Sequence, residues 1–426
     1  MKTNLKAGCA LLKDKGFKTQ LERERKNGMK KNWEKMVAFC LTVFLLLGIV
    51  ACSDSSAKKG ETKEAETIVL GFIGPLTGDS AIWGMVGSYA CQMLVKKTNE
   101  EGGILGKKVE LKIYDNRGDT VETTNAARKA ILNDGVVAFI GPDASSTAIA
   151  LDEVCAKYGI PHVTTQGTNY KVTQNEEDGS VRPYSFRICL SDPQLGDVMA
   201  GYAYDVLGYR KVAILYEVSS EYSLGITQNF TESFEAKGGA VTITEAYNAG
   251  DVDYRAQLTK IKDFGDYDAL MIPANYKEVG LTAVQARAMG IDCPFIGVDA
   301  WAMQDLFEIA GEELKGGVFP TAMDLTDESL NVFKEWFKEE WDMDPDSAGT
   351  DAYFAADIYM LIKHVIETKG EATPEAIREG LENAKDVPLL TSVITMDPKT
   401  HNPVRTASIM KVGDGEFIKI DEYRFE

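Results

Sequence analysis

The chain has 426 residues, of which 44% are hydrophobic and 26% are charged, and these values are ordinary for globular proteins. They exclude a largely disordered chain and a protein built mainly from membrane spans. Acidic residues outnumber basic ones by 65 to 46, so the formal net charge is −19 and nucleic acid is excluded as a favourable partner.

The first apolar segment lies near the amino terminus. Lys30, Lys31 and Lys35 precede an apolar stretch from Met36 to Val50. This stretch is shorter than the roughly 20 residues that a helix needs to cross a bilayer. A basic start followed by a short apolar run predicts a signal peptide over residues 1–51.

The end of this segment, Ile49-Val50-Ala51-Cys52, resembles the lipobox of bacterial lipoproteins. The resemblance implies that the chain is cut before Cys52 and that this cysteine is lipidated. An uncleaved anchor ending in an incidental cysteine is the alternative. Residues 52–66 are rich in Ser, Lys, Glu and Thr and predict a flexible tether. No apolar run precedes Met29, which favours Met29 as the true start.

The first half of the mature chain alternates short apolar runs with amphipathic stretches. This alternation predicts a parallel sheet with helices on both faces. Strands are expected at 68–74, 107–115, 136–141 and 160–164, and helices at 82–100, 121–134 and from the Ser145-Ser146 cap onward.

A second run of the same kind follows the polar stretch Asn169–Arg182. We therefore expect an α/β fold with two doubly wound parallel-sheet lobes. Strands are expected at 185–190, 211–217, 240–247, 268–273, 293–298 and 316–321, with β-like sequence from 389 onward, and helices at 194–207, 224–237, 254–264, 277–289, 327–340, 350–368 and 374–383.

Signatures of catalysis and of metal or cofactor binding are missing from the sequence. It has no nucleophile elbow, P-loop or dinucleotide-binding glycine pattern. His162, His364 and His401 are dispersed and lack metal-binding spacing. We therefore expect neither an enzyme nor a cofactor or metal site. The remaining cysteines suggest no disulfide pairing and are expected to be buried free thiols: Cys91, Cys155, Cys189 and Cys293.

Polar loops follow several of the predicted strands, and ligands of open parallel sheets gather at the carboxyl ends of strands. The loop Pro142–Thr147 enters a helix, so its N–H groups and hydroxyls suit a carboxylate. Thr164–Tyr170 forms a second such loop. In the second lobe Ser219–Tyr222 and Asp299 follow strands, and Asp299 suits an ammonium group. Ordinary helix caps and solvated turns are the alternative reading of each loop taken alone.

The segments IVLGFIGPLTGDSAIWG, NEEGGILGKKVELKIYDNRGD, GVVAFIGPDASSTAIA and FIGVDAW resemble the leucine/isoleucine/valine-binding proteins, the type I periplasmic substrate-binding proteins of ABC importers. The similarity extends from about Ile68 to the carboxyl terminus. It implies two lobes joined by a three-segment hinge. The implied lobes are residues 67–184 with 323–393, and residues 185–322 with 394–426.

The resemblance also implies a set of ligand-binding residues. Ser145 and Thr168 match positions that bind the head group of the ligand, and Gln166 falls where a backbone carbonyl contributes. Asp299 matches the acid that pairs with the α-ammonium, and Tyr222 matches a tyrosine that closes over the ligand. The full implied set is Trp83, Ala144, Ser145, Gln166, Thr168, Tyr222, Asn275, Asp299 and Tyr353, in which Trp83 and Tyr353 line the side-chain pocket.

Two positions depart from the pattern of the aliphatic binders. Asp143 stands where they have an apolar residue, and Asn275 stands where they have a pocket tyrosine. An unpaired carboxylate beside a leucine side chain would be costly, so the ligand is more polar or Asp143 points elsewhere. An amino-acid head group is still expected, whereas leucine itself does not follow.

These observations predict a lipid-anchored solute-binding protein on the extracytoplasmic face of the cell membrane. It would capture an amino acid, branched-chain or related, between its lobes and deliver it to an ABC permease. The alternative is a ligand-sensing module of the same fold that acts on a signalling partner. Such modules usually continue into a transmembrane or signalling segment, which favours the transport function for this sequence.

Overall fold

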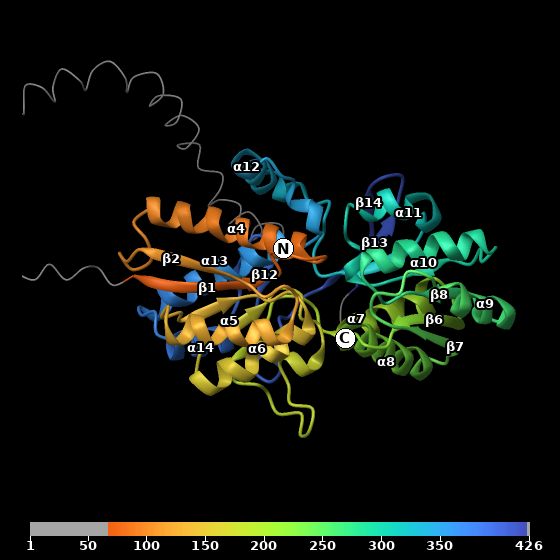
Figure 1. The fold of residues 1–426 in the computed structure, drawn as a ribbon, viewed down its shortest axis with the longest axis horizontal. Helices are drawn as coiled ribbons and strands as arrows, with labels where there is room; N and C mark the ends of the chain where they lie inside the picture. The colour runs from red at the N-terminus through yellow and green to blue at the C-terminus, as the bar shows by residue number, and fades with distance from the viewer. Residues whose placement is uncertain (1–66, 424–426) are drawn as a thin grey trace, which may run out of the picture. The chain divides into compact units, whose positions relative to one another are not determined.

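The computed structural model describes residues Thr67–Tyr423, which belong to one compact unit. The predicted signal peptide, Cys52 and the tether lie outside the described residues. Within Thr67–Tyr423 the strands form two large sheets and one two-stranded ribbon, and Figure 1 shows a lobe around each large sheet. No helix in this range combines the length and the apolar composition needed to cross a membrane.

The first sheet has five parallel strands in the order β2-β1-β3-β4-β5. β1 pairs on both sides, and its sequence IVLGFIG is almost entirely buried, as expected for a parallel strand covered on both faces. The strands are β1 (Ile68–Gly74), β2 (Val109–Asp115), β3 (Ala138–Ile140), β4 (His162–Thr164) and β5 (Ser185–Arg187).

Helices cover both faces of the first sheet. α4 and α13 pack together on one face, and α5 and α6 pack together on the other (Figure 1). Ile73, Phe139 and Leu151 belong to the core between the sheet and the α5–α6 pair. The helices of this lobe are α4 (Ala81–Glu100), α5 (Thr120–Leu132), α6 (Ser145–Tyr158), α12 (Asn331–Trp341), α13 (Asp351–Lys369) and α14 (Pro374–Glu382).

The second sheet has seven strands in the order β14-β13-β10-β9-β8-β6-β7. The five strands from β10 to β7 are parallel, whereas β13 is antiparallel to both β10 and β14. The strands are β6 (Lys211–Glu217), β7 (Ala240–Tyr247), β8 (Ala269–Met271), β9 (Phe295–Ile296), β10 (Val318–Thr321), β13 (Ala407–Val412) and β14 (Phe417–Tyr423).

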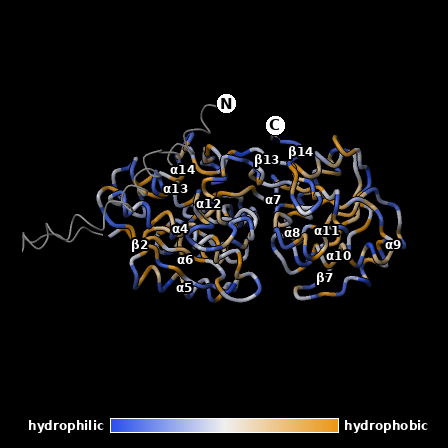
Figure 2. Tube along the Cα trace, turned by 90° about the horizontal axis from the view of Figure 1, so that it is seen from above, coloured by the Kyte–Doolittle hydropathy of each residue, from blue (hydrophilic) through white to orange (hydrophobic). Residues whose placement is uncertain are grey.

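Helices α7 and α8 pack together on one side of the second sheet, and α10 and α11 pack together on the other (Figure 1). Figure 2 shows hydrophobic and hydrophilic segments alternating along the trace in both lobes, as expected when one face of each helix is buried. The helices are α7 (Asp192–Gly201), which continues into the π-helical turn Tyr202–Val206, α8 (Glu221–Ala236), α9 (Arg255–Phe264), α10 (Tyr276–Ala288) and α11 (Leu306–Leu314).

The chain passes between the two sheets three times: after β5, after β10 and after the ribbon of β11 (Val387–Pro388) and β12 (Val393–Ile394). Three connections are what the predicted three-segment hinge requires. The two sheets with their helices confirm the predicted fold class.

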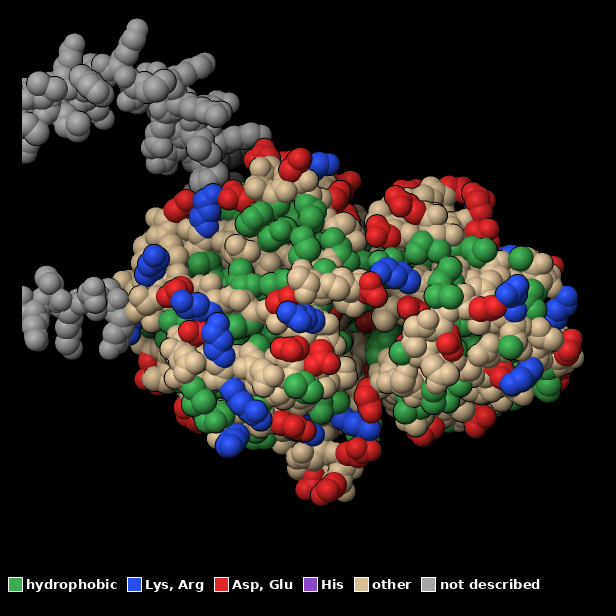
Figure 3. Space-filling view, viewed as in Figure 1, with side chains coloured by type: hydrophobic (Ala, Val, Ile, Leu, Met, Phe, Trp, Pro, Cys, Tyr) green, Lys and Arg blue, Asp and Glu red, His purple; other side chains and the backbone are tan. Residues whose placement is uncertain are grey.

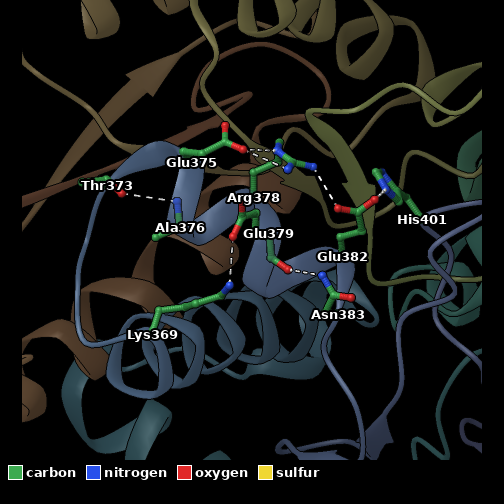
Figure 4. Close-up of polar contacts among 9 residues, drawn as sticks. All are labelled: Lys369, Thr373, Glu375, Ala376, Arg378, Glu379, Glu382, Asn383 and His401. Atoms are coloured by element: carbon green, nitrogen blue, oxygen red, sulfur yellow. Dashed lines mark hydrogen bonds and ion pairs between the residues drawn. The ribbon is translucent and has the colours of Figure 1, made fainter.

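The third connection is fixed to the first lobe through His401. This residue is buried, its ring stacks on Phe186 of β5 with centroids 4.0 Å apart, and its Nδ1 lies 3.0 Å from the carbonyl oxygen of Ser185. On its other side His401 faces Glu382 of α14, which also accepts a hydrogen bond from Arg378 (Figure 4). Burial lowers the pKa of His401, which favours the neutral ring.

Three elements differ from the sequence predictions. β5 pairs with β4 in the first sheet, although the boundary predicted at residue 185 gave this strand to the second lobe. Buried Arg187 explains the placement, because its guanidinium donates to the carbonyl oxygens of Gly167 and Asn169 in the first lobe. Helix α11 was not predicted, and it has one non-helical residue, Ala310, in its interior. Finally, Ala144 rather than Ser145 is the N-cap of α6.

Candidate solute-binding site

A cavity of about 210 Å³ lies among loops at the carboxyl ends of both sheets. The loops after β3 and β4 line it from the first lobe, and those after β6, β8 and β9 line it from the second. Pockets for drug-sized ligands are roughly 300–1,000 Å³, so this volume suits one small solute. Figure 3 shows the surface indented between the two lobes.

Seven of the nine residues predicted to bind ligand line this cavity, namely Trp83, Ala144, Ser145, Gln166, Tyr222, Asn275 and Asp299. The structure therefore brings together side chains that are far apart in the sequence. Further polar residues on the wall are Ser80, Asp143, Ser146, Ser219, Ser220, Glu221, Thr350 and Asp351.

Asp299 follows β9 and begins a short 3₁₀ turn. Its Oδ1 accepts hydrogen bonds from the Tyr222 hydroxyl at 2.6 Å and from the N–H of Ala300 at 3.1 Å. Buried Trp301 anchors the turn by donating from Nε1 to the carbonyl oxygen of Ile272 at 3.0 Å. Burial raises the pKa of Asp299 from 3.8 to about 6, and the bond from Tyr222 opposes this rise. A buried carboxylate held in this way is suited to an ammonium group.

The amino terminus of α6 faces the same cavity. Ala144 caps the helix without a side-chain hydrogen bond, so the first helical N–H groups have no intrahelical acceptor. The Ser145 Oγ accepts the N–H of Asn169 at 3.1 Å, which leaves the hydroxyl hydrogen available to donate. Free N–H groups, a hydroxyl and the positive end of a helix together suit a carboxylate.

A third group of polar side chains belongs to the first lobe. Asp143 is only 9% exposed, and its Oδ1 has no hydrogen-bond partner. Asp351 is 4% exposed and receives two long contacts, from Thr165 Oγ1 at 3.3 Å and from Gln166 Nε2 at 3.5 Å. Burial raises the pKa of Asp143 from 3.8 to about 6. The pKa of Asp351 is raised well above 3.8 by burial and then by the negative charge of Asp143.

Aromatic side chains close another part of the wall. Trp83 of α4 donates from its Nε1 to the sulfur of Met303 at 3.1 Å, which connects the first lobe to the second. The Trp83 ring also lies edge-on to Tyr276, with centroids 6.1 Å apart. Asn275, the residue before Tyr276, lines the cavity at the start of α10.

The structure does not bring Thr168 and Tyr353 to the cavity wall. Thr168 is fully buried, and its backbone carbonyl accepts the N–H of Asp192 at 2.7 Å. Tyr353 is buried in the first lobe, where its hydroxyl donates to Asp346 and its ring packs on Phe333. Successive helical residues point in different directions, so Asp351 at the start of α13 faces the cavity while Tyr353 does not.

Three further residues that line the cavity were not predicted from the sequence: Met303, Thr350 and Asp351. Thr350 and Asp351 open a predicted helix, and a polar pair at such a start is usually interpreted as a cap. Met303 follows a predicted strand end by several residues and has no polar signal. Only the packing of α13 and of the loop after β9 shows that these residues belong to the site.

Direct contacts join the two lobes beside the cavity. Asn169 of the first lobe donates from its side-chain amide to the carbonyl oxygen of Glu221 at 2.7 Å. Lys171 forms an ion pair with the Glu221 carboxylate at 3.2 Å. Glu221 therefore already has a basic partner, unlike the aspartates on the cavity wall.

The family profile described as "periplasmic binding protein" matches residues 67–416. The Leu/Ile/Val-binding protein BraC3 of Rhizobium johnstonii is 28% identical over 329 residues, which is 77% of this chain and 87% of that protein. A leucine-, isoleucine-, valine-, threonine- and alanine-binding protein of Pseudomonas aeruginosa is 27% identical over 74% of this chain and 82% of its own length.

Solved structures are similar over a comparable length. The leucine-binding protein LivK of Thermotoga maritima superposes with a TM-score of 0.75 at 28% identity, covering 84% of this chain and 99% of that one. LivJ of Streptococcus pneumoniae in complex with isoleucine gives a TM-score of 0.76 at 27% identity, covering 84% and 100%. The chain belongs to the periplasmic binding protein family, and its role is to bind a solute rather than to catalyse a reaction.

Proposed function

We propose that this protein captures an amino acid in the cavity between its lobes and delivers it to an ABC permease. The observation that carries the proposal is that one cavity has a group suited to an ammonium and a group suited to a carboxylate. Asp299, held by Tyr222, offers a carboxylate to the α-ammonium. The amino terminus of α6 with Ser145 offers hydrogen-bond donors to the α-carboxylate. The branched-chain amino acids named for the relatives support a ligand of this class.

Removal of the acid tests the head-group assignment. We expect Asp299→Asn to weaken the binding of any zwitterionic amino acid by about 30-fold or more, because the buried ammonium loses its charged partner. The measurement is calorimetry on the purified protein with a panel of L-amino acids. Asp305→Asn removes an equal charge from an exposed position outside the cavity and should leave affinity within about twofold.

The D-enantiomers and the decarboxylated amines of the same ligands complete the panel. A site that binds both the α-ammonium and the α-carboxylate should reject them, because the D-enantiomer cannot place both groups correctly at once and the amine has no carboxylate. If no zwitterion binds, or if the Asp299→Asn protein binds as tightly as the unaltered protein, the amino-acid function is wrong.

We also propose that the mature protein is held at the extracytoplasmic membrane surface by lipid on Cys52. The sequence Ile49–Cys52 supports the lipid attachment, and membership of the family supports the extracytoplasmic location. The full chain expressed in a bacterium should fractionate with membranes and carry acyl chains on its first residue, as detected by mass spectrometry. Cys52→Ala should lose both properties while ligand affinity is unchanged. An unmodified Cys52 in the mature chain would contradict the anchor.

A further inference from the structure

Most of the acidic side chains on the cavity wall have no basic partner. Four acidic residues line it, and none of the described lining residues is Lys, Arg or His. Glu221 is paired with Lys171 at 3.2 Å. The three aspartates, Asp143, Asp299 and Asp351, have no such partner on the wall.

The nearby buried arginines bind other groups. Arg187 donates to the carbonyl oxygens of Gly167 and Asn169, each at 2.8 Å. Arg405 lies 3.3 Å from the carboxylate of Asp357. These cations therefore stabilise loops and a different acid, and neither lines the cavity.

The head group of an amino acid would satisfy only one of the three aspartates. Asp299 would receive the α-ammonium, and the amino terminus of α6 would receive the α-carboxylate. Asp143 and Asp351 would remain beside the rest of the ligand. Asp143 is nine-tenths buried with one carboxylate oxygen unpaired, and Asp351 has only contacts of 3.3 and 3.5 Å for its two oxygens.

An aliphatic side chain would seal these carboxylates in an apolar contact without a partner, which is unfavourable for any buried polar group. A cationic side chain would instead provide charge-assisted hydrogen bonds to both. Asp143 and Asp351 belong to the first lobe and Asp299 to the second, so a ligand with charges at both ends would also attract both lobes.

We propose that the preferred solute is a basic amino acid, of the class of lysine, ornithine or arginine, whose side-chain cation is held by Asp143 and Asp351. This inference rests on the proposed function, because it places the ligand head group at Asp299 and α6. It adds the chemistry of the side chain, which the head-group residues do not specify.

Calorimetry on the purified protein tests the proposal with pairs of ligands that differ only in side-chain charge. L-lysine is compared with L-norleucine, and L-arginine with L-citrulline. One of the basic members should bind at least about 30-fold more tightly than its neutral counterpart, because a buried charge pair is lost in the latter. L-leucine, L-glutamine and calcium chloride serve as further probes.

Asp143→Asn should remove most of that preference, lowering affinity for the basic ligand by about tenfold or more while affinity for the neutral ligand stays equal or rises. Asp351→Asn should act in the same direction, and Asp305→Asn should not. The Asn variants retain the shape of the side chain and remove a buried unpaired charge, so a folded protein is expected, and its thermal transition verifies this.

Leucine or norleucine binding as tightly as lysine and arginine would overturn the basic-ligand proposal and leave the amino-acid function intact. Preference for glutamine or citrulline would do the same and would assign the two aspartates to a neutral amide or urea group. Stabilisation by calcium alone would assign them to a metal ion. Failure of every zwitterion to bind would instead overturn the proposed function itself.

Discussion

Asp143 shows how one side chain changes the character of the site. It follows the buried strand β3, precedes the cap of α6 and is only 9% exposed. Burial therefore acts on the carboxyl group directly, and its pKa rises to about 6. The sequence posed the alternative that Asp143 points elsewhere, and the structure places Asp143 on the cavity wall with its carboxyl group buried.

This shift predicts how the stability of the ligand-free protein depends on pH. A carboxyl group whose pKa is higher in the folded state than in the unfolded state stabilises the fold when protonated. That contribution is present below about pH 4 and is lost as the pH rises through about 6. Asp143→Asn lacks this loss, so the variant should become more stable relative to the unaltered protein as the pH rises, by up to about 3 kcal/mol.

Thermal unfolding of ligand-free protein between pH 4.5 and 8 measures this difference. The N–H groups of Asp143 and Ala144 and the carboxyl group of Asp351 face the Asp143 carboxyl group, and Asp351 adds to the same trend because its pKa is raised as well. Other buried acids, such as Asp192 with a pKa of about 8, are present in both proteins and cancel in the comparison. A difference that does not change with pH would contradict the prediction.

At the scale of elements, α6 and α8 present their amino termini to the space between the lobes. α8 begins at Glu221, whose carbonyl oxygen accepts from Asn169 of the other lobe at 2.7 Å. Gly225 permits two close contacts at once, because a Cβ atom there would lie 2.1 Å from Oδ2 of Asp192 in α7 of the same lobe and 2.7 Å from Nδ2 of Asn169 in the first lobe. The absence of a side chain at this helical position thus sets how closely α8 can approach both α7 and Asn169 of the first lobe.

Gly225→Ala should therefore oppose the approach of the two lobes. Overpacking costs about 1–3 kcal/mol, and if that cost falls on the ligand-bound arrangement, affinity should fall roughly 5- to 150-fold. Calorimetry with the best ligand of the panel measures the effect. Gly311→Ala is the matched control, because a Cβ atom there meets only Phe307, at 3.5 Å. Unchanged affinity in the Gly225→Ala protein would show that the contact does not limit closure.

At the scale of the whole molecule, the three connections between the sheets determine how the lobes can act together. A ligand that touches Asp299 in one lobe and α6 in the other stabilises the arrangement in which both lobes enclose it. The hydrogen bond of 3.1 Å from Trp83 Nε1 to the Met303 sulfur and the ion pair of Lys171 with Glu221 add direct contacts between the lobes. Solute capture is therefore a property of the pair of lobes and not of either sheet alone.

Much of this architecture could be predicted from the sequence. Strands such as Ile68–Gly74 and Lys211–Glu217 are short apolar runs bounded by turns. Their strand conformation and their burial could therefore be predicted from the sequence. Polar loops after those strands indicated Ser145, Tyr222 and Asp299 because parallel strands direct their carboxyl ends to one edge. β5 was assigned to the wrong lobe because the sequence of a three-residue strand does not indicate which neighbouring strand it pairs with.

The sequence by itself determined the α/β alternation, the two lobes, the acidic balance and the residues suited to an amino-acid head group, because these depend on local composition and on the order of elements. Only the tertiary structure decided that Asp143 and Asp351, more than 200 residues apart in the sequence, line one cavity without a basic partner. It also decided that Thr168 and Tyr353 lie outside that cavity. The physical reason is that burial and pairing of a side chain depend on groups from other elements, and no local pattern specifies them.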